Sequence, residues 1–495
     1  MSVGDFQAML PLVALGAAAV AVMLAISIRR SHRACALLAA LGLAAALALL
    51  PVAAAGAPRQ IGAMLTIDHF ALYYMGLILS AALAVVMISQ PYLAHCKPGV
   101  MAEEYYMLVL LATLGASVLP ASSHFASFLL GLEILSVSLF AMIAYRREQA
   151  ASLEAGIKYL VLAGLSSALL VFGMALVYAG RGTMNLGELA GGSGGGMLPA
   201  AGMAIMTVGI GFKLAVAPFQ FWTPDVYQGS PAPVAAFIST VSKGAIFALL
   251  VRYFWRMNSG TAFPGCDHAT GWKACATAGA VFWTFAAIAV ASMITGNLLA
   301  LRQSNIKRIL AYSSIAHMGY LLVAFLAAGE LAAVAVGVYL AAYFVAKIGA
   351  FGVVAALTGP RGEAVDVVGD YRGLAWRRPW LAAVMTAMLL SLAGLPLTAG
   401  FVGKFYVLAA GAGGGLWALA VILILNSAVG LFYYLRVISE MFRPAEDADV
   451  ASEASSVQSR STPWPTAAAL CLLSAALVGI GVYPQPLLAL IGRLP

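Results

Sequence analysis

The sequence predicts an all-α polytopic membrane protein with about fourteen transmembrane helices. Of its 495 residues, 63% are hydrophobic and only 9% are charged, whereas about a quarter of the residues in soluble proteins are charged. Apolar runs of twenty or so residues recur along the chain, and each is long enough to cross ~30 Å of hydrocarbon as a helix. The runs are continuously apolar, whereas the strands of a membrane barrel would alternate apolar and polar residues.

The predicted spans follow one another with mostly short connections. We expect them near residues 9–28, 35–55, 70–91, 105–120, 123–144, 155–179, 201–222, 231–256, 277–300, 308–328, 332–357, 379–408, 413–437 and 464–490. Two connections are longer. Residues 181–200 are rich in glycine and are expected to be flexible, and residues 438–463 are acidic and rich in serine and are expected to form a solvated connector.

The basic residues predict how the chain is oriented in the membrane. Seventeen Lys and Arg residues fall in or beside the odd-numbered connections, six fall on the opposite side, and four lie inside spans. Basic residues concentrate on the cytoplasmic side of membrane proteins, so both termini are expected on the outer side. The net charge of +8 is scattered singly over short loops, which argues against a nucleic-acid partner.

Two predicted spans are interrupted at corresponding places. The seventh span contains Lys213 and then Pro218, which must break or bend a helix. Five spans later, the twelfth is interrupted at residues 394–398 and then carries Lys404. Because the offset is odd, the two broken helices cross the membrane in opposite directions, as in transporters built from inverted repeats. The predicted division is 1–100 for the first three spans, 101–260 for a first repeat of spans four to eight, 261–440 for a second, inverted repeat of spans nine to thirteen, and 441–495 for a connector and the last span.

The motifs of common cofactor sites are missing from the sequence. It has no GxGxxG or GxxxxGK(S/T) phosphate-binding loop, and its five cysteines form no CxxC pair. Cys266 and Cys275 share one predicted loop, where they could form a disulfide or remain two free thiols. No pair of histidines lies at haem-like depth on facing spans, so electron transfer through this chain is not expected.

Ionisable residues inside the spans are the main functional candidates, because each costs ~2.5–3.5 kcal/mol at the bilayer centre on insertion scales. Glu133 is the only acid well inside a predicted span. One interpretation is a structural glutamate that is neutralised by its proton or held by a hydroxyl such as Ser136. The other is a partner of Lys213 on another helix, in which case breaking the pair would change the proton affinity of both groups.

Three further lysines are predicted inside spans. Lys243 lies twelve residues past Pro231, which is ~18 Å along the eighth span and near the middle of the bilayer. Lys404 lies eight residues past Pro396, and Lys347 lies in the middle of the eleventh span. Each could be a structural lysine whose long stem reaches the membrane surface. The depth of Lys243 favours instead a group that gains and loses a proton.

Other polar residues have two interpretations each. Glu154 and Lys158 are spaced i, i+4, so they either stabilise their helix as an ion pair or form a polar relay toward the acid of the fifth span. His317, within AYSSIAHMGY, is either a hydrogen-bonded structural histidine or part of a hydrated proton path. Residues 223–230 are predicted to form a polar turn that Asp225 caps.

Three long segments resemble a known family. They are GFKLAVAPFQFWTPDVYQGSPAPVAAFISTVSK at 211–243, NLLALRQSNIKRILAYSSIAHMGY at 297–320 and SLAGLPLTAGFVGKFYVL at 391–408. They look like the antiporter-like membrane subunits of respiratory complex I, the NADH–quinone oxidoreductase, and the resemblance extends over essentially the whole chain. The lysine in GFVGKF resembles the N-type subunits, since the M-type subunits usually have glutamate there. The L-type is disfavoured because no residues are left for its long C-terminal lateral helix.

The resemblance implies a fold and a set of proton-carrying residues. The fold is fourteen helices with two inverted five-helix bundles, helices 4–8 and 9–13, in which helices 7 and 12 are discontinuous. The family has a glutamate on the fifth helix and a lysine on the seventh, which match Glu133 and Lys213. It has a lysine on the eighth and a lysine or glutamate on the twelfth, which match Lys243 and Lys404. Lys347 resembles an eleventh-helix lysine of some relatives, and its role stays open.

The resemblance also implies a function, partners and a location. The chain is expected to be a proton-translocating subunit, without a redox centre of its own, of a NADH–quinone oxidoreductase in the bacterial cytoplasmic (inner) membrane. FMN, the iron–sulfur clusters, NADH and quinone would belong to partner subunits, so no cofactor is expected in this chain. The expected partners are M-like and K-like neighbours, subunits J, A and H, and membrane lipids.

The implied mechanism starts with a signal that disturbs the glutamate and lysine of the first repeat. Lys213 would then shift the pKa of Lys243, and the proton would pass through Lys347 or His317 to Lys404 and leave there or move laterally. The direction in which the proton leaves stays open. The alternatives are an Mrp-type cation/proton antiporter subunit, the antiporter-like subunit of a membrane-bound hydrogenase, or a structural spacer.

Overall fold

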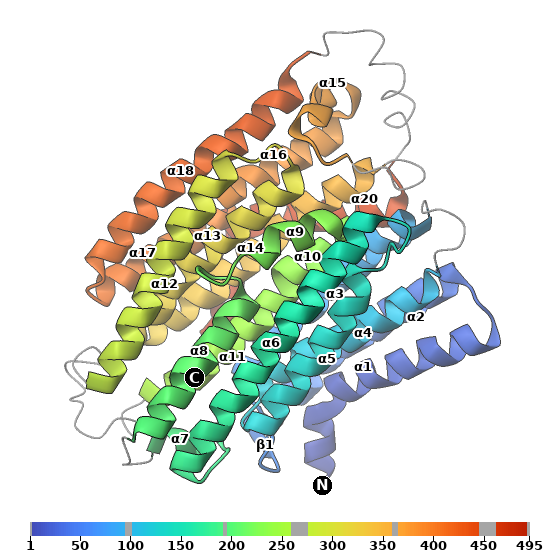
Figure 1. Cartoon of the computed structure of the whole chain (residues 1–495). Coiled ribbons are helices and arrows are strands. Elements are labelled where there is room, and N and C mark those ends of the chain that lie inside the picture. The colour runs from blue at the N-terminus through green and yellow to red at the C-terminus, as the bar shows by residue number, and fades with distance from the viewer. Residues whose placement is uncertain are drawn as a thin grey trace.

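The computed structural model describes residues 2–94, 101–191, 196–258, 276–358, 365–444 and 462–492, and it is a bundle of long helices that run side by side (Figure 1). Within these residues, thirteen helices are long and apolar enough to cross a membrane. Two shorter apolar helices, α16 (Pro379–Ala393) and α17 (Ala399–Gly413), follow each other as the two halves of one further span. The fourteen predicted spans, including the interruption of the twelfth, are therefore confirmed.

The boundaries of the spanning helices agree with the predicted ones to within a few residues in most cases. The single helices are α1 (Val3–Ile28), α2 (His32–Ala54), α3 (His69–Ala94), α4 (Glu103–Val118), α5 (Phe125–Ile143), α6 (Ala150–Arg181), α8 (Met197–Leu214), α12 (Ala276–Leu301), α13 (Ile306–Ala327), α14 (Glu330–Leu357), α18 (Trp417–Phe442) and α20 (Trp464–Val482). The eighth span is composite and consists of α10 (Ala232–Phe237), a π-helical turn (Ile238–Ser242) and α11 (Lys243–Asn258).

The remaining described elements are short. They are the antiparallel hairpin of β1 (Arg59–Ile61) and β2 (Leu65–Ile67), the helices α7 (Leu186–Gly191), α9 (Trp222–Gly229), α15 (Leu374–Arg377) and α21 (Gln485–Ile491), and two 3-10 turns (Leu119–Ala121 and Val368–Tyr371). The hairpin was not predicted, because its two strands have only three residues each.

The first broken span differs from its prediction. α8 ends at Leu214, and Ala215 takes the left-handed conformation with a φ of 56°, since Pro218 prevents the helix from continuing. Residues 223–230, predicted as a polar turn, instead belong mostly to the helix α9. Pro224 falls in its first turn, where the missing N–H removes no intrahelical hydrogen bond. The predicted turn was therefore wrong, and the seventh span is two helical halves separated by a short break.

The glycine-rich connection at 181–200 has more structure than predicted in its described part. α7 forms there, and the backbone N–H of Leu186 donates to the carbonyl of Ser123 over 2.8 Å. The N–H of Phe125 donates to the carbonyl of Met184 over 3.0 Å. This connection therefore packs against the beginning of α5.

Two parts of the prediction fall outside the described residues. One is most of the acidic, serine-rich connector at 438–463, and the other is the loop that holds Cys266 and Cys275. Both stay predictions.

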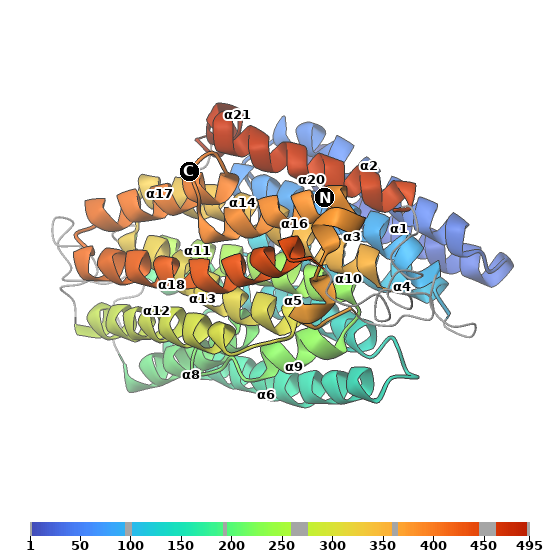
Figure 2. The ribbon, with the colours of Figure 1, turned by 90° about the horizontal axis from the view of Figure 1, so that it is seen from above.

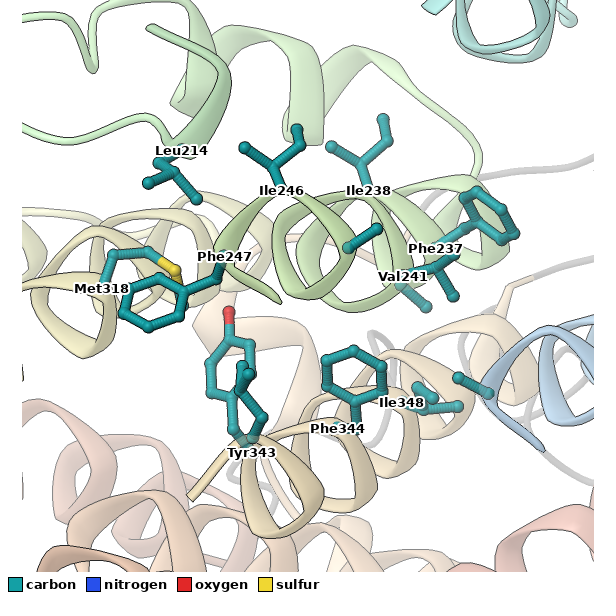
Figure 3. Packing of buried hydrophobic residues seen from close by; sticks show 14 of the residues in the cluster. Leu214, Phe237, Ile238, Val241, Ile246, Phe247, Met318, Tyr343, Phe344 and Ile348 are labelled. Carbon is teal, nitrogen blue, oxygen red and sulfur yellow. The ribbon is translucent and has the colours of Figure 1, made fainter. Parts of the chain in front are cut away.

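Three spans form the centre of the bundle. The eighth span, α13 and α14 are buried along almost their whole length, whereas α1, α2 and α20 are buried mainly on one side and lie at the periphery (Figure 2). In Figure 3, Tyr343 and Phe344 of α14 point from their helix toward the eighth span, beside Phe247 and Val241. The most protected environment in the described chain is therefore the contact between these central helices.

Two glycines allow α6 and α8 to cross closely. A Cβ placed on Gly173 of α6 would lie 2.7 Å from the carbonyl oxygen of Gly202 on α8. The reverse holds too, since a Cβ on Gly202 would lie 2.6 Å from the carbonyl oxygen of Gly173. These distances exclude a side chain at either position, so the placement of α8 depends on both glycines.

We predict that Gly173→Ala destabilises the protein, by about 1–3 kcal/mol as is typical of overpacking, although alanine favours helix. The matched control is Gly164→Ala on the same helix, where an added Cβ meets nothing within 4 Å. Thermal unfolding of the purified protein in detergent measures both variants. A lower midpoint for Gly173→Ala alone is expected, and equal midpoints for the two variants would contradict the close crossing.

Candidate functional site

The four lysines predicted inside the spans are all buried. Their exposed fractions are 4% for Lys213, 0% for Lys243 and Lys347, and 8% for Lys404. Their Nζ atoms donate hydrogen bonds to hydroxyl and carbonyl oxygens. Among the described residues, no carboxylate lies within ion-pair distance of any of the four. They are therefore buried amines whose hydrogen-bond acceptors are neutral. Their burial argues against the alternative that these side chains reach the membrane surface.

Lys213 lies in the last turn of α8, directly before the first break. Its Nζ donates to Oγ of Ser136 on α5 over 2.8 Å. Glu133, one turn earlier on α5, attracts this amine from beyond ion-pair distance, and its Oε1 is buried without a hydrogen-bond partner. The sequence suggested Ser136 as a possible hydrogen-bond partner of Glu133, but in the structure this hydroxyl accepts a hydrogen bond from Lys213. Glu133 and Lys213 are thus neighbours with Ser136 between their helices rather than a direct ion pair.

Lys243 follows the π-helical turn of the eighth span. Its Nζ donates to Oγ of Ser314 on α13 over 2.8 Å and lies 5.8 Å from the ring centre of Tyr227 on α9. The hydroxyl of Tyr343 on α14 donates to the same Ser314 Oγ over 2.7 Å. A π-helical turn adds a residue to a helix and recurs at functional sites, and here it immediately precedes the buried amine.

Lys347 and His317 belong to one hydrogen-bonded network. Nζ of Lys347 donates to the carbonyl of Leu310 over 2.6 Å and to Oγ of Ser313 over 2.9 Å. Ser313 shares a hydrogen bond with the hydroxyl of Tyr434 on α18, which lies 3.3 Å from Nε2 of His317. The sequence predicted Lys347 or His317 as the next proton carrier, and in the structure Ser313 and Tyr434 connect the two residues by hydrogen bonds.

A single side of α13 presents the partners of these groups. Residues 310, 313, 314 and 317 are spaced by three and four, so they share one face of the helix. His317 also shares a hydrogen bond of 2.6 Å between its Nδ1 and the hydroxyl of Tyr339 on α14. The segment AYSSIAHMGY therefore carries two serines and a histidine toward the lysines of the eighth and eleventh spans.

Lys404 lies on α17, just after the second break. Its Nζ donates to the carbonyls of Leu392 and Ala393 over 3.1 and 2.6 Å, and to Oγ of Ser427 over 2.7 Å. The two carbonyls are available because α16 ends at Ala393, and a helix C-terminus also attracts positive charge. Gly394, with a φ of 86°, makes room, since a Cβ there would lie 2.6 Å from Cδ of Lys404.

A small cavity separates Lys404 from His317. It is lined by both residues together with Tyr339, Tyr343 and Ser391. Its volume is about 10 Å³, counted as the space that the centre of a water molecule can occupy. That space is close to the minimum that holds one water molecule. The line of polar groups therefore continues from His317 toward Lys404 across a gap of molecular size.

Glu154 and Lys158 lie apart from this line. Nζ of Lys158 contacts Oε1 of Glu154 at 2.6 Å and Oδ2 of Asp225 on α9 at 2.8 Å. Asp225 also pairs with Arg308 of α13 at 2.7 Å. Lys158 is thus directed to the second half of the broken span rather than to Glu133, so the structure does not bring the predicted relay together. Asp225 bridges three helices and does more than cap a turn.

Two buried ion pairs were not predicted from the sequence. Asp68 accepts two hydrogen bonds from Arg252 of α11, over 2.5 and 3.0 Å, and Lys307 of α13 contacts Asp366 at 2.9 Å. The partners are far apart in sequence, so no local spacing indicates them. Only a weak indication of these pairs is present in the sequence, which is that the acid of each pair lies at the edge of an apolar segment.

We predict that Asp68→Asn destabilises the protein by about 3–5 kcal/mol, because it leaves the buried guanidinium of Arg252 without its counter-ion. The control is Asp5→Asn, which removes a partly exposed pair with Arg59 and is expected to cost about 0–1 kcal/mol. Thermal or denaturant unfolding in detergent compares the two variants. Similar small losses of stability in both variants would show that the buried pair contributes no more to stability than the partly exposed pair.

Comparison with known proteins finds relatives over almost the whole chain. A family model described as NADH:quinone oxidoreductase/Mrp antiporter matches residues 122–265 and 272–430. A protein named NADH-quinone oxidoreductase subunit N, from Ectopseudomonas mendocina, is 46% identical over 98% of this chain and 95% of its own length. The matched ranges include the four lysines inside the spans, Glu133 and His317.

Solved structures share the fold. A chain of respiratory complex I from Thermus thermophilus with bound aureothin is 33% identical, with a TM-score of 0.79 over 98% of this chain and 99% of that chain. A chain of the Mrp complex of a Dietzia species has a TM-score of 0.82 over 100% of this chain and 97% of that chain, at 20% identity. A chain of an archaeal membrane-bound sulfane sulfur reductase has a TM-score of 0.79 at 23% identity, over 100% and 97%. The last two similarities concern the fold alone. The family match and the two relatives of higher identity show that the chain belongs to the NADH:quinone oxidoreductase/Mrp antiporter family of membrane subunits.

Proposed function

We propose that this chain is the N-type membrane-arm subunit of a NADH–quinone oxidoreductase and that it transfers protons through its buried lysines. Its relative of that name shares 46% of residues over nearly the whole length, whereas the Mrp chain shares 20%. The difference favours the oxidoreductase over an antiporter. The chain takes part in the reaction as a proton-translocating subunit without a redox centre.

The observation that carries the proposal is the set of buried lysines joined by hydroxyl groups. An ammonium group buried without a carboxylate is costly to keep charged, which suits a site that gives up and regains a proton. Hydroxyls of serine and tyrosine both donate and accept hydrogen bonds, so they can pass a proton between such sites. A structural spacer would need none of these features.

The second repeat offers a route of hydrogen bonds that one small cavity interrupts. From Lys347 the contacts lead through Ser313 and Tyr434 to His317, and the small cavity leads on to Lys404. Lys243 lies beside this route, because its partner Ser314 also accepts a hydrogen bond from Tyr343, whose ring centre lies 5.7 Å from Nζ of Lys347. Proton movement along this line leaves the backbone unchanged and needs only rotation of hydroxyls and exchange of protons on the amines and the imidazole.

Glu133 is where we place the drive from a neighbouring subunit. It is half-buried, and Leu130 and Val137, one turn away on either side, are 59% and 58% exposed. A change of charge outside this face would alter how strongly Glu133 attracts Lys213, which lies behind it. The amine could then exchange Ser136 for another partner and pass the change inward.

The cofactors of the complex, the partner subunits and the location that we propose follow from this assignment. FMN, the iron–sulfur clusters, NADH and quinone would be held by other subunits, and M-like and K-like subunits would flank this chain, with J, A and H further along the same membrane arm. The membrane would be the bacterial cytoplasmic membrane, with both termini on its outer side, in agreement with the distribution of basic residues.

We predict that Tyr434→Phe lowers the number of protons moved per NADH oxidised, because it removes the hydroxyl that joins Ser313 to His317. NADH-driven proton uptake into membrane vesicles that contain the assembled complex measures this ratio. The control is Tyr371→Phe, whose buried hydroxyl donates to the carbonyl of Val365 away from the lysines. A ratio that stays at the level of the unmodified complex in Tyr434→Phe would remove this link from the route.

A further inference from the structure

A cleft runs along α3, with α2 on one side of it and α14, α20 and α21 on the other (Figure 2). Its first part has a volume of about 700 Å³ and extends along α3 from His69 to Ser80. Its second part, of about 280 Å³, continues to Met87. Leu47, Leu77 and Ser80 line both parts. The two parts are therefore one continuous cleft, which we call the α3 cleft.

The walls of the α3 cleft are mainly apolar. Among the described residues that line it, only His69 and Tyr73 are ionisable. The hydroxyl of Tyr73 donates to the carbonyl of Gly337 on α14 over 2.9 Å, and the hydroxyl of Ser80 donates to the carbonyl of Gly76 in its own helix over 2.7 Å. The cleft thus presents hydrocarbon along its length and the imidazole of His69 at one end.

The cleft begins at a membrane surface. His69 is the first residue of α3, and α21, which comes after the last span, lines the same part of the cleft with Leu487 and Leu490. Ser80 lies eleven residues after His69, which is a rise of ~17 Å along the helix. One leaflet contributes about half of the ~30 Å of hydrocarbon in a bilayer. The first part of the cleft is therefore about as deep as one leaflet.

The cleft is open toward the membrane along its side. Four of its lining residues, Pro51, Ala55, Ser80 and Leu490, are exposed. Empty apolar space forfeits the dispersion contacts of its walls, and an ordered water molecule needs roughly two to four polar partners. The volume of the first part is typical of sites that bind small molecules. A hydrocarbon ligand from the membrane therefore suits the cleft better than a void or water does.

The shape of the cleft indicates which ligand this is. A spanning helix of another subunit is ~10–12 Å wide with its side chains and would need a groove along the full ~30 Å of hydrocarbon. The wide part of the α3 cleft ends at the depth of one leaflet. A polar group at the membrane surface followed by hydrocarbon to the depth of one leaflet is the pattern of a phospholipid.

We infer that the α3 cleft binds one phospholipid from the leaflet on the side of the two termini, with an acyl chain along α3 and the phosphate beside His69. The chain packs against the face of α14 that carries Ala341 and Val345, so it fills space behind the central helix that holds Lys347. This binding goes beyond the proposed function and does not require proton transfer.

The test is Ser80→Phe, which places a ring where the two parts of the cleft meet. The control is Ser27→Phe on α1. Ser27 is also exposed, and its hydroxyl also donates within its own helix, to the carbonyl of Met23 over 3.1 Å, but it does not line the cleft. The probe is a phosphatidylglycerol whose acyl chain carries bromine at its middle. The structure of the whole complex in nanodiscs of this lipid is determined by electron cryomicroscopy.

We expect bromine density in the cleft near Ser80 and a phosphate within hydrogen-bonding distance of His69, both in the unmodified complex and in Ser27→Phe. Ser80→Phe should lose the bromine density. If Ser80→Phe does not assemble, Ala55→Phe blocks the open end of the cleft and should lose the same density.

Three results overturn the inference. They are a cleft that stays empty, a cleft filled by a quinone tail or by side chains of another subunit, and bromine density that persists in the blocked variant. The readout is the position of a lipid rather than proton uptake. The proposed function is therefore tested separately, by the uptake measured with Tyr434→Phe and with Lys243→Ala.

Discussion

The structure depends on keeping four amines inside an apolar core, where no carboxylate of the described residues lies within ion-pair distance of them. A lysine at the centre of a membrane helix costs ~2.5–3.5 kcal/mol on insertion scales, so oxygen dipoles must be brought to each one. The described helices do this with hydroxyls from neighbouring helices and with carbonyls exposed at a helix end. Because the groups that accept hydrogen bonds from Lys243, Lys347 and Lys404 are neutral, each of these three amines can change its protonation state without leaving an unpaired anion behind.

The two broken spans serve this need in different ways. In the first, Lys213 precedes the break and takes the hydroxyl of Ser136 from α5. In the second, Lys404 follows the break and reaches back to the carbonyls that end α16. The inverted repeats thus give the same backbone interruption two chemical uses. The first leaves the amine close to Glu133 and the surface of the subunit, and the second holds it at the end of the hydroxyl network.

The sequence predicted the features that local composition controls, and it missed those that depend on distant partners. Apolar runs, prolines and glycines located the fourteen spans and both breaks, and the depth of Lys243 along its helix indicated its burial. The contact of Lys243 with Ser314 joins residues 71 apart, and Arg252 meets Asp68 across 184 residues, so no spacing could indicate either. α9 was predicted as a turn because the segment is polar and contains a proline. A proline is tolerated in the first turn of a helix, so the segment forms a helix in the structure. The hydroxyl of Ser136 accepts from Lys213 across 77 residues, so the sequence could not indicate this contact either.

Proton pumping by the complex that carries Lys243→Ala tests whether the buried lysines transfer protons, since this amine is fully buried and lies between the two repeats. The measurement is proton uptake against NADH–quinone turnover in membranes with an assembled complex. We expect uptake to fall, either together with turnover, if the path is obligatory, or as fewer protons per electron, if the path can be separated from the redox drive. Unchanged rates and an unchanged ratio of protons to electrons would contradict the account and leave Lys243 with a structural role.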